Sequence, residues 1–71
     1  MAYNMEFVDT ENEDVVYSFP ADSRDHIPKN RDVVDINNTN YTVLSRKYRY
    51  TVDQKFGKLN TIIVYLEPKG N

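Results

Sequence analysis

The residues best suited to chemistry in this chain form a basic and aromatic stretch in its second half. Aromatic rings interleaved with bases can stack on nucleotide bases and neutralise phosphates, as they do in proteins that bind single strands. The same positive charge would also suit an acidic protein partner. The candidate binding residues are Arg46, Lys47, Tyr48, Arg49 and Tyr50, together with Lys55 and Lys58 on the turn that follows.

The alternation of a strand offers an ordinary structural interpretation of this stretch. Successive side chains of a strand point to opposite faces. If Tyr48 and Tyr50 face the core, the bases Lys47 and Arg49 form a solvated outer face. Arg46 then shares the parity of the tyrosines. A strand with tyrosines inside and bases outside needs no partner, so the structural and the binding interpretations both stay open.

Signatures of catalysis are missing from the sequence. It has no cysteine, and its single histidine, His26, stands in a polar segment with Ser23 and Asp25 nearby. A catalytic triad depends on arrangement in space rather than on adjacency, so this neighbourhood indicates a solvated loop histidine. With only two glycines, the chain has no phosphate-binding glycine loop. We expect no enzymatic activity and no cofactor.

An acidic cluster superficially resembles the alternating oxygen ligands of a calcium loop. Its members are Asp9, Glu11, Glu13 and Asp14. An EF-hand loop that began at Asp9 would need glycine at position 14 and a bidentate acid at position 20. The chain has Asp14 and Pro20 at those positions. The cluster therefore indicates the solvated end of a hairpin, and we expect no metal site.

Charge is distributed unevenly along the chain, although the net charge is only −2. Residues 1–35 hold nine acids and three bases, whereas residues 36–71 hold six bases and two acids. Such asymmetry indicates either an electrostatically matched partner or two halves whose charges offset each other on folding.

The 71 residues leave room for one small domain, residues 1–71. Without cysteines or paired histidines, its stability must come from packing, which a homodimer through a sheet edge would help. No run of about 18 apolar residues is present. The N-terminal residues lack the basic and apolar regions of a signal peptide. We expect a cytoplasmic protein without a membrane partner.

The sequence predicts an all-β protein, because aromatic and β-branched residues are frequent and no helical periodicity is present. We expect strands at residues 2–9, 15–19, 32–36, 41–52 and 59–67. The asparagine-rich residues 37–40 predict a tight turn, and residues 22–25 predict a single helical turn. Such strands predict one strongly bent, five-stranded antiparallel sheet that closes into a small barrel, since closure removes exposed edges.

The apolar phase changes within the fourth predicted strand, from odd positions (Tyr41, Val43) to even ones (Leu44, Tyr48). A change of phase inside a strand indicates a β-bulge or a sharp bend. We therefore expect Val43 and Leu44 both to be buried, with the strand bending between them.

Residues 32–68 resemble the pattern of small SH3-like barrel proteins of bacteria, phages and mobile elements. The likeness rests on Asp32-Val33-Val34-Asp35-Ile36, an asparagine turn, Tyr41-Thr42-Val43 and the closing run Ile62-Ile63-Val64-Tyr65-Leu66-Glu67-Pro68. Arg31 stands where that pattern usually has glycine. The asparagine-rich composition is also similar to that of proteins from phages and other mobile elements. The resemblance implies an SH3-like barrel but no particular activity, because such barrels serve many functions.

The missing catalytic signatures and the segregated charge favour a non-catalytic interaction module that binds another protein. A small accessory protein of a phage or mobile element would fit this description. The alternative is single-stranded nucleic-acid binding through the basic and aromatic residues 46–50.

Overall fold

The computed structural model describes residues 3–52 and 57–69, which form five strands. They are β1 (Tyr3–Asp9), β2 (Asp14–Ala21), β3 (Val33–Ile36), β4 (Thr39–Val52) and β5 (Gly57–Pro68). Each predicted strand is therefore confirmed, although the ends differ. Ala2, expected in the first strand, and Lys55, expected in the last turn, lie outside the described residues. Lys58, also expected in that turn, belongs to β5.

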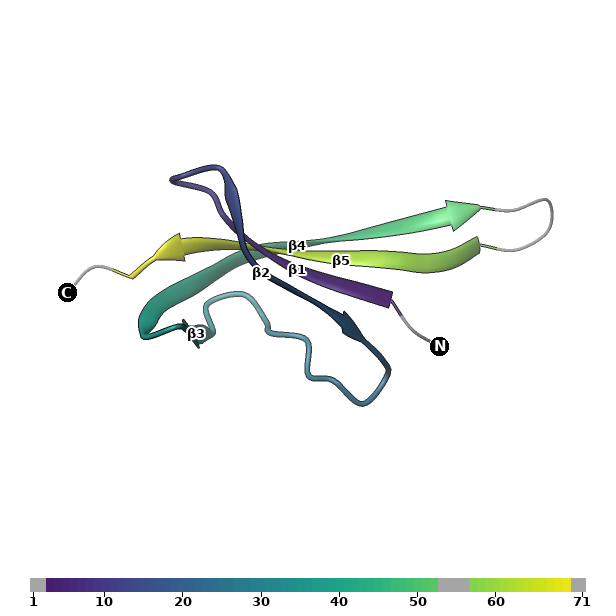
Figure 1. Ribbon diagram of the computed structural model, residues 1–71, viewed down its shortest axis with the longest axis horizontal. Helices are drawn as coiled ribbons and strands as arrows, with labels where there is room; N and C mark the ends of the chain where they lie inside the picture. Colours follow the sequence, from purple (N-terminus) through teal and green to yellow (C-terminus); the bar gives the residue numbers. More distant parts are fainter. Residues whose placement is uncertain (1–2, 53–56, 70–71) are drawn as a thin grey trace.

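The five strands form one mixed sheet in the order β2-β1-β5-β4-β3 (Figure 1). Neighbouring strands run antiparallel except β1 and β5, which run parallel. The sheet curls through 216° into a half-barrel that stays open. The predicted closed antiparallel barrel is therefore wrong in its closure and in the direction of one pair. What the structure shares with the SH3-like resemblance is a small, curled, five-stranded sheet.

The half-barrel stays open because its edge strands, β2 and β3, do not pair with each other. β3 has only four residues, and β2 contains Pro20, which has no N–H to donate to a ladder. The connection between them supplies Ile27 to the core, and Pro28 is buried. Apolar side chains of the connection therefore cover part of the core that pairing of β2 with β3 would have covered. Residues 22–25 form a hydrogen-bonded turn there rather than the predicted helical turn.

The core lies on the inner face of the curled sheet. Across the parallel pair, Met5 lies beside Ile62 and Phe7 beside Val64. The buried cluster consists of Met5, Phe7, Ala21, Tyr41, Val43, Ile62, Val64 and Leu66. On β2, the rings of Tyr17 and Phe19 stack with Phe7 at centroid distances of 6.1 and 6.3 Å, and with each other at 5.2 Å. Every strand except β3 thus contributes a buried residue to one cluster.

The predicted bulge is present in β4. Val43 pairs with Leu66 and Ser45 with Tyr65, so Leu44 is the extra residue. Val43 is 1% exposed, but Leu44 is 41% exposed. The prediction that both residues are buried is therefore wrong for Leu44. The bulge absorbs the extra residue and leaves its side chain outside the core.

Alanine substitutions at the bulge should show that Val43 stabilises the core and that Leu44 does not. Val43→Ala should lower the free energy of unfolding by about 1.5–3 kcal/mol, because a fully buried side chain loses its packing. Leu44→Ala should lower it by no more than about 0.5 kcal/mol, as surface substitutions do. Urea denaturation followed by circular dichroism measures both values. Equal losses in the two variants would show that this division between core and surface is incorrect.

The turn between β3 and β4 confirms the role predicted for its asparagines. Asn37 and Asn38 have φ angles of 52° and 68°, between the paired residues Ile36 and Thr39. Two consecutive positive φ angles are typical of the type I′ turn, whose twist matches that of a hairpin. Arg31 also has a positive φ of 76°, at the position where the SH3-like pattern usually has glycine.

Glycine at position 31 should stabilise the protein. A left-handed backbone costs a non-glycine residue roughly 1–2 kcal/mol, whereas the extra freedom of glycine in the unfolded chain costs about 0.4–1 kcal/mol. We expect Arg31→Gly to gain about 0.5–1 kcal/mol and to raise Tm by roughly 2–8 °C in thermal melts. Arg31→Ala keeps the Cβ atom and should bring no gain. A gain with alanine as large as with glycine would exclude relief of backbone strain as the cause.

Candidate binding site on β4

β4 is much longer than the strand on one side of it. It has 14 residues, whereas β3 has four and pairs only with residues 39–42. Two further backbone hydrogen bonds on that side, each 2.8 Å, join Val43 to Arg31 and Asp32. Among the described residues, no backbone hydrogen bond reaches residues 45–52 on that side. We call residues 45–52 the free edge of β4.

The two long strands continue beyond β1 as a two-stranded ribbon. β1 pairs with β5 from Asn4↔Thr61 onward, whereas β4 and β5 stay paired as far as Val52↔Gly57. Figure 1 shows this ribbon projecting from the curled part of the sheet. All residues of the free edge are exposed. The segment therefore contributes little to the core and is accessible to a partner.

The register with β5 assigns the side chains of the free edge to two faces. Tyr48 lies opposite the core residue Ile62, and Lys47 lies opposite Ile63. By alternation, the inner face carries Arg46, Tyr48, Tyr50 and Val52, and the outer face carries Ser45, Lys47, Arg49 and Thr51. The predicted parity is confirmed. However, Tyr48 and Tyr50 are 44% and 59% exposed, so neither is a core residue.

The bases of the free edge have no acidic partner among the described residues. In that part of the chain, the one ion pair joins Arg24 to Asp22 at 2.8 Å, on the connection between β2 and β3. β4 itself contains no acid. Lys58 lies opposite Thr51 and adds positive charge beside the outer face. Lys55, the remaining candidate, lies outside the described residues. Ion pairs within the described chain therefore do not cancel the positive charge of this edge.

The hydroxyl group of Tyr3, in β1, lies near the carboxylates of Asp22 and Asp25. The Tyr3 hydroxyl donates a hydrogen bond of 3.1 Å to the carbonyl of Asp22. Burial raises the pKa of Tyr3, and the nearby ionisable groups of Asp25, Asp22 and Tyr48 raise it further. Negative charge therefore lies near the Tyr3 hydroxyl.

The acidic hairpin end is a tight turn built on Asp9. Asp9 is only 2% exposed, and its carboxylate accepts hydrogen bonds from the Asn12 side chain (2.7 Å) and from the N–H groups of Glu11 (2.9 Å) and Asn12 (3.2 Å). These hydrogen bonds, that of the Asn12 side chain first, hold the pKa of Asp9 below its usual value. In the described ranges, no three His, Cys, Asp or Glu side chains are placed to hold a metal ion. Asp9 thus serves the turn.

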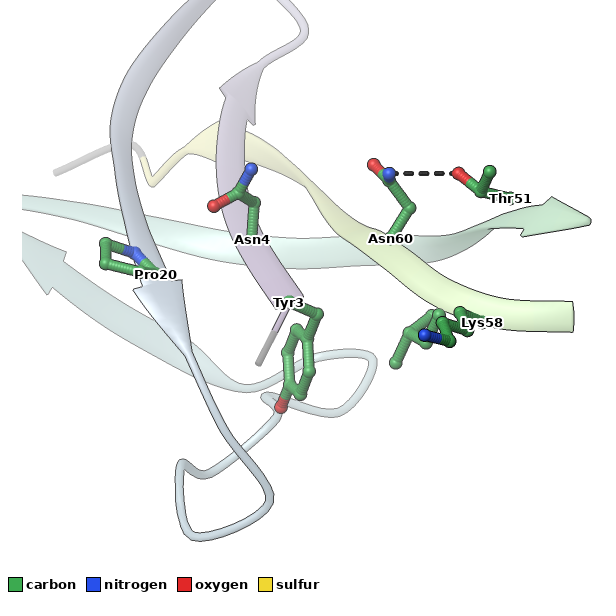
Figure 2. Close-up of a pocket in the computed structure, with 7 residues that line it drawn as sticks. Tyr3, Asn4, Pro20, Thr51, Lys58 and Asn60 are labelled. Carbon is green, nitrogen blue, oxygen red and sulfur yellow. Dashed lines mark hydrogen bonds between the residues drawn. The ribbon is translucent and has the colours of Figure 1, made fainter. Parts of the chain in front are cut away.

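A groove of about 390 Å³ lies where the ribbon leaves the curled sheet (Figure 2). It is lined by Tyr3, Asn4 and Pro20 from β1 and β2, and by Thr51, Lys58, Leu59 and Asn60 from the ribbon. Asn60 donates a side-chain hydrogen bond of 3.0 Å to the Thr51 hydroxyl, as Figure 2 shows. Sequence reasoning missed this groove because its lining comes from four strands. Only Lys58 among its residues was a candidate.

The residues near the single histidine lie in an exposed turn. His26, Ser23 and Asp25 are all exposed. The Asp25 carboxylate accepts a hydrogen bond of 2.8 Å from the N–H of Asp22, so it is engaged in the local turn. This segment therefore shapes the connection between β2 and β3.

No family model matches the chain, and no curated protein or solved structure is significantly similar to it. Within the described residues, no helix is long and apolar enough to cross a membrane. The function must therefore be inferred from the geometry of the chain itself. The free edge of β4, with its exposed bases and tyrosines, is the feature best suited to binding.

Removing the charge of Asp9 should make the protein less stable at neutral pH and less sensitive to acid. A carboxyl whose pKa is lowered on folding stabilises the fold above its unfolded value, here 3.8, and loses that contribution as pH falls through the lowered value. We expect the Tm of Asp9→Asn to lie below that of the wild type at about pH 7, and the two to converge towards about pH 2. Thermal melts across this range measure the effect.

The matched control is Asp35→Asn, at an exposed position of β3. The difference in Tm between Asp35→Asn and the wild type should stay the same as the pH falls. If the Tm difference between Asp9→Asn and the wild type stays constant as pH falls, the charge of Asp9 does not stabilise the turn.

Proposed function

We propose that this protein is a non-catalytic interaction module that binds an acidic surface of another protein through the free edge of β4. One observation carries the proposal. Residues 45–52 form an exposed strand that is unpaired on one side and carries three bases without an acidic partner, among the residues the structure describes. Unpaired strand edges are templates for pairing with another chain. An edge that is long, exposed and charged can pair selectively with a partner of opposite charge.

The distribution of charge supports an acidic partner. The chain as a whole has a net charge of −2, so its attraction for acidic surfaces is local. Lys47 and Arg49 share the outer face, and Lys58 lies on the neighbouring strand. Positive charges clustered in this way increase association rates with acidic surfaces and suppress wrong partners. Because the cluster is exposed, salt should weaken the interaction strongly.

Single-stranded nucleic acid is the second candidate partner. The exposure of Tyr48 and Tyr50 favours it, because fully buried rings could not stack on bases. One feature favours the protein partner instead. Two of the three bases, Lys47 and Arg49, lie on the face opposite to the tyrosines, so only Arg46 could contact a phosphate on the side where the rings would stack.

Other expectations about this protein stay predictions from sequence. These are its lack of enzymatic activity, its cytoplasmic location and its origin in a phage or mobile element. A relationship to small SH3-like barrel proteins is a proposal that rests on residues 32–68. The type I′ turn between β3 and β4 supports it.

Charge reversal at the free edge tests the proposed function. The immobilised wild-type protein should capture a protein partner from a lysate of the cells that produce it, and rising salt should release that partner. The variant Lys47→Glu plus Arg49→Glu should capture at least about tenfold less of this partner, because attraction becomes repulsion. The control Lys29→Glu plus Lys69→Glu makes the same change in net charge at exposed positions elsewhere and should keep the partner.

Equal capture by the edge variant and the wild type would contradict the proposal. Recovery of nucleic acid alone would also contradict it and would favour the second candidate. In that case Tyr48→Ala should weaken binding of a fluorescent oligothymidylate, because a stacking platform is lost. Circular dichroism of each variant verifies that it is folded.

A further inference from the structure

We infer that the free edge of β4 binds an extended, acidic segment of the partner as a sixth strand of the sheet. This inference rests on the proposed function, and it specifies how the partner is held and which sequence pattern is bound. Binding by strand addition uses backbone hydrogen bonds for affinity and alternate side chains for specificity.

The free edge is the longest regular unpaired edge of the described sheet. β4 is regular over residues 45–52, because the register shift beside Tyr50 makes Asn60 of β5 the extra residue. The other edges suit strand addition less well. β3 has four residues, while β2 contains Pro20 and a bulge in which Val16 is the extra residue. An incoming strand can therefore form a longer uninterrupted ladder with β4 than with β2 or β3.

Charge determines which strand can pair with this edge. Side chains directly opposite each other on paired strands lie about 4.5–5.5 Å apart, and like charges in such pairs are destabilising. Lys47 and Arg49 flank Tyr48, so a second copy paired antiparallel about Tyr48 would place Lys47 opposite Arg49. Bases on natural edge strands prevent self-pairing in this way. The same bases favour a strand with acids at the opposing positions over a second copy paired in this register.

Alternation along β4 specifies the rest of the pattern. Lys47 and Arg49 lie on the outer face. On the inner face, Arg46 is followed by Tyr48, Tyr50 and Val52, which are 44%, 59% and 77% exposed. The side chains of an added strand alternate in step with those of β4. Acidic side chains would lie beside the bases, and apolar side chains would cover the exposed tyrosines and valine. The bound segment therefore alternates acidic and apolar residues.

A fluorescein-labelled peptide that alternates glutamate and valine is the probe. It should bind the full chain at low salt, measured by fluorescence anisotropy, and a lysine–valine peptide should not. An added strand directs every second N–H group towards β4 and the others towards solvent. N-methylation of one alternate set of amides should therefore weaken binding about tenfold or more, and N-methylation of the other set should change it by less than about twofold.

Hydrogen exchange and a charge swap locate the bound peptide. Amide exchange should slow in residues 45–52 when the peptide binds and should not change in β2. The variant Lys47→Glu plus Arg49→Glu should bind the lysine–valine peptide and reject the glutamate–valine peptide. The control Lys29→Glu plus Lys69→Glu should keep the original preference.

Two results would overturn strand addition while leaving the proposed function in place, provided that edge-dependent capture of a protein partner is observed. One is equal binding of the two N-methylated peptides, and the other is protection of β2 instead of the free edge. Failure of the glutamate–valine peptide to bind at low salt would likewise overturn the inferred sequence pattern. Tighter binding of oligothymidylate than of this peptide would overturn both the inference and the proposed function.

Discussion

The pairing of β1 with β5 is the interaction on which the rest of the structure depends. It joins the β1–β2 hairpin to the β3–β4–β5 meander, which share no other pair of strands. Across this pair Met5 lies beside Ile62 and Phe7 beside Val64, and all four side chains are buried. Because the two strands come from opposite ends of the chain, their pairing closes the longest loop in the fold, and burial of the core must offset that loss of entropy.

This arrangement leaves the long strands with unequal neighbours. β4 and β5 have 14 and 12 residues, whereas β1 has seven and β3 has four. The core uses the part of β4 around Tyr41 and Val43, and residues 45–52 are exposed. Packing therefore constrains the side chains of the free edge little, which leaves them available for binding. A closed barrel would have no such edge, so the incomplete closure and the candidate site have the same structural origin.

Local features of the fold could be predicted from the sequence because they depend on neighbouring residues. Alternation located the strands, the asparagines of residues 37–40 indicated a tight turn, and the change of phase indicated the bulge in β4. The direction of β1 relative to β5 could not be predicted, because side chains alternate with the same period in parallel and antiparallel strands. Leu44 shows a similar limit: the change of phase indicates that a residue is extra, but not that its side chain stays outside the core.

The candidate site, too, could be predicted from the sequence only in part. The parity of residues 46–50 follows from alternation, whereas the exposure of Tyr48 and Tyr50 depends on which parts of the chain pack against them, which no local pattern encodes. Because β3 begins only at Val33, opposite Thr42, β4 has an open edge beyond that pair. An apolar edge of that length would pair with any exposed strand, including its own copy. Because this edge carries bases, β4 pairs favourably only with a strand whose opposing side chains are not basic. On the proposed function, the bases that repel a second copy from β4 are therefore also the groups that attract an acidic partner.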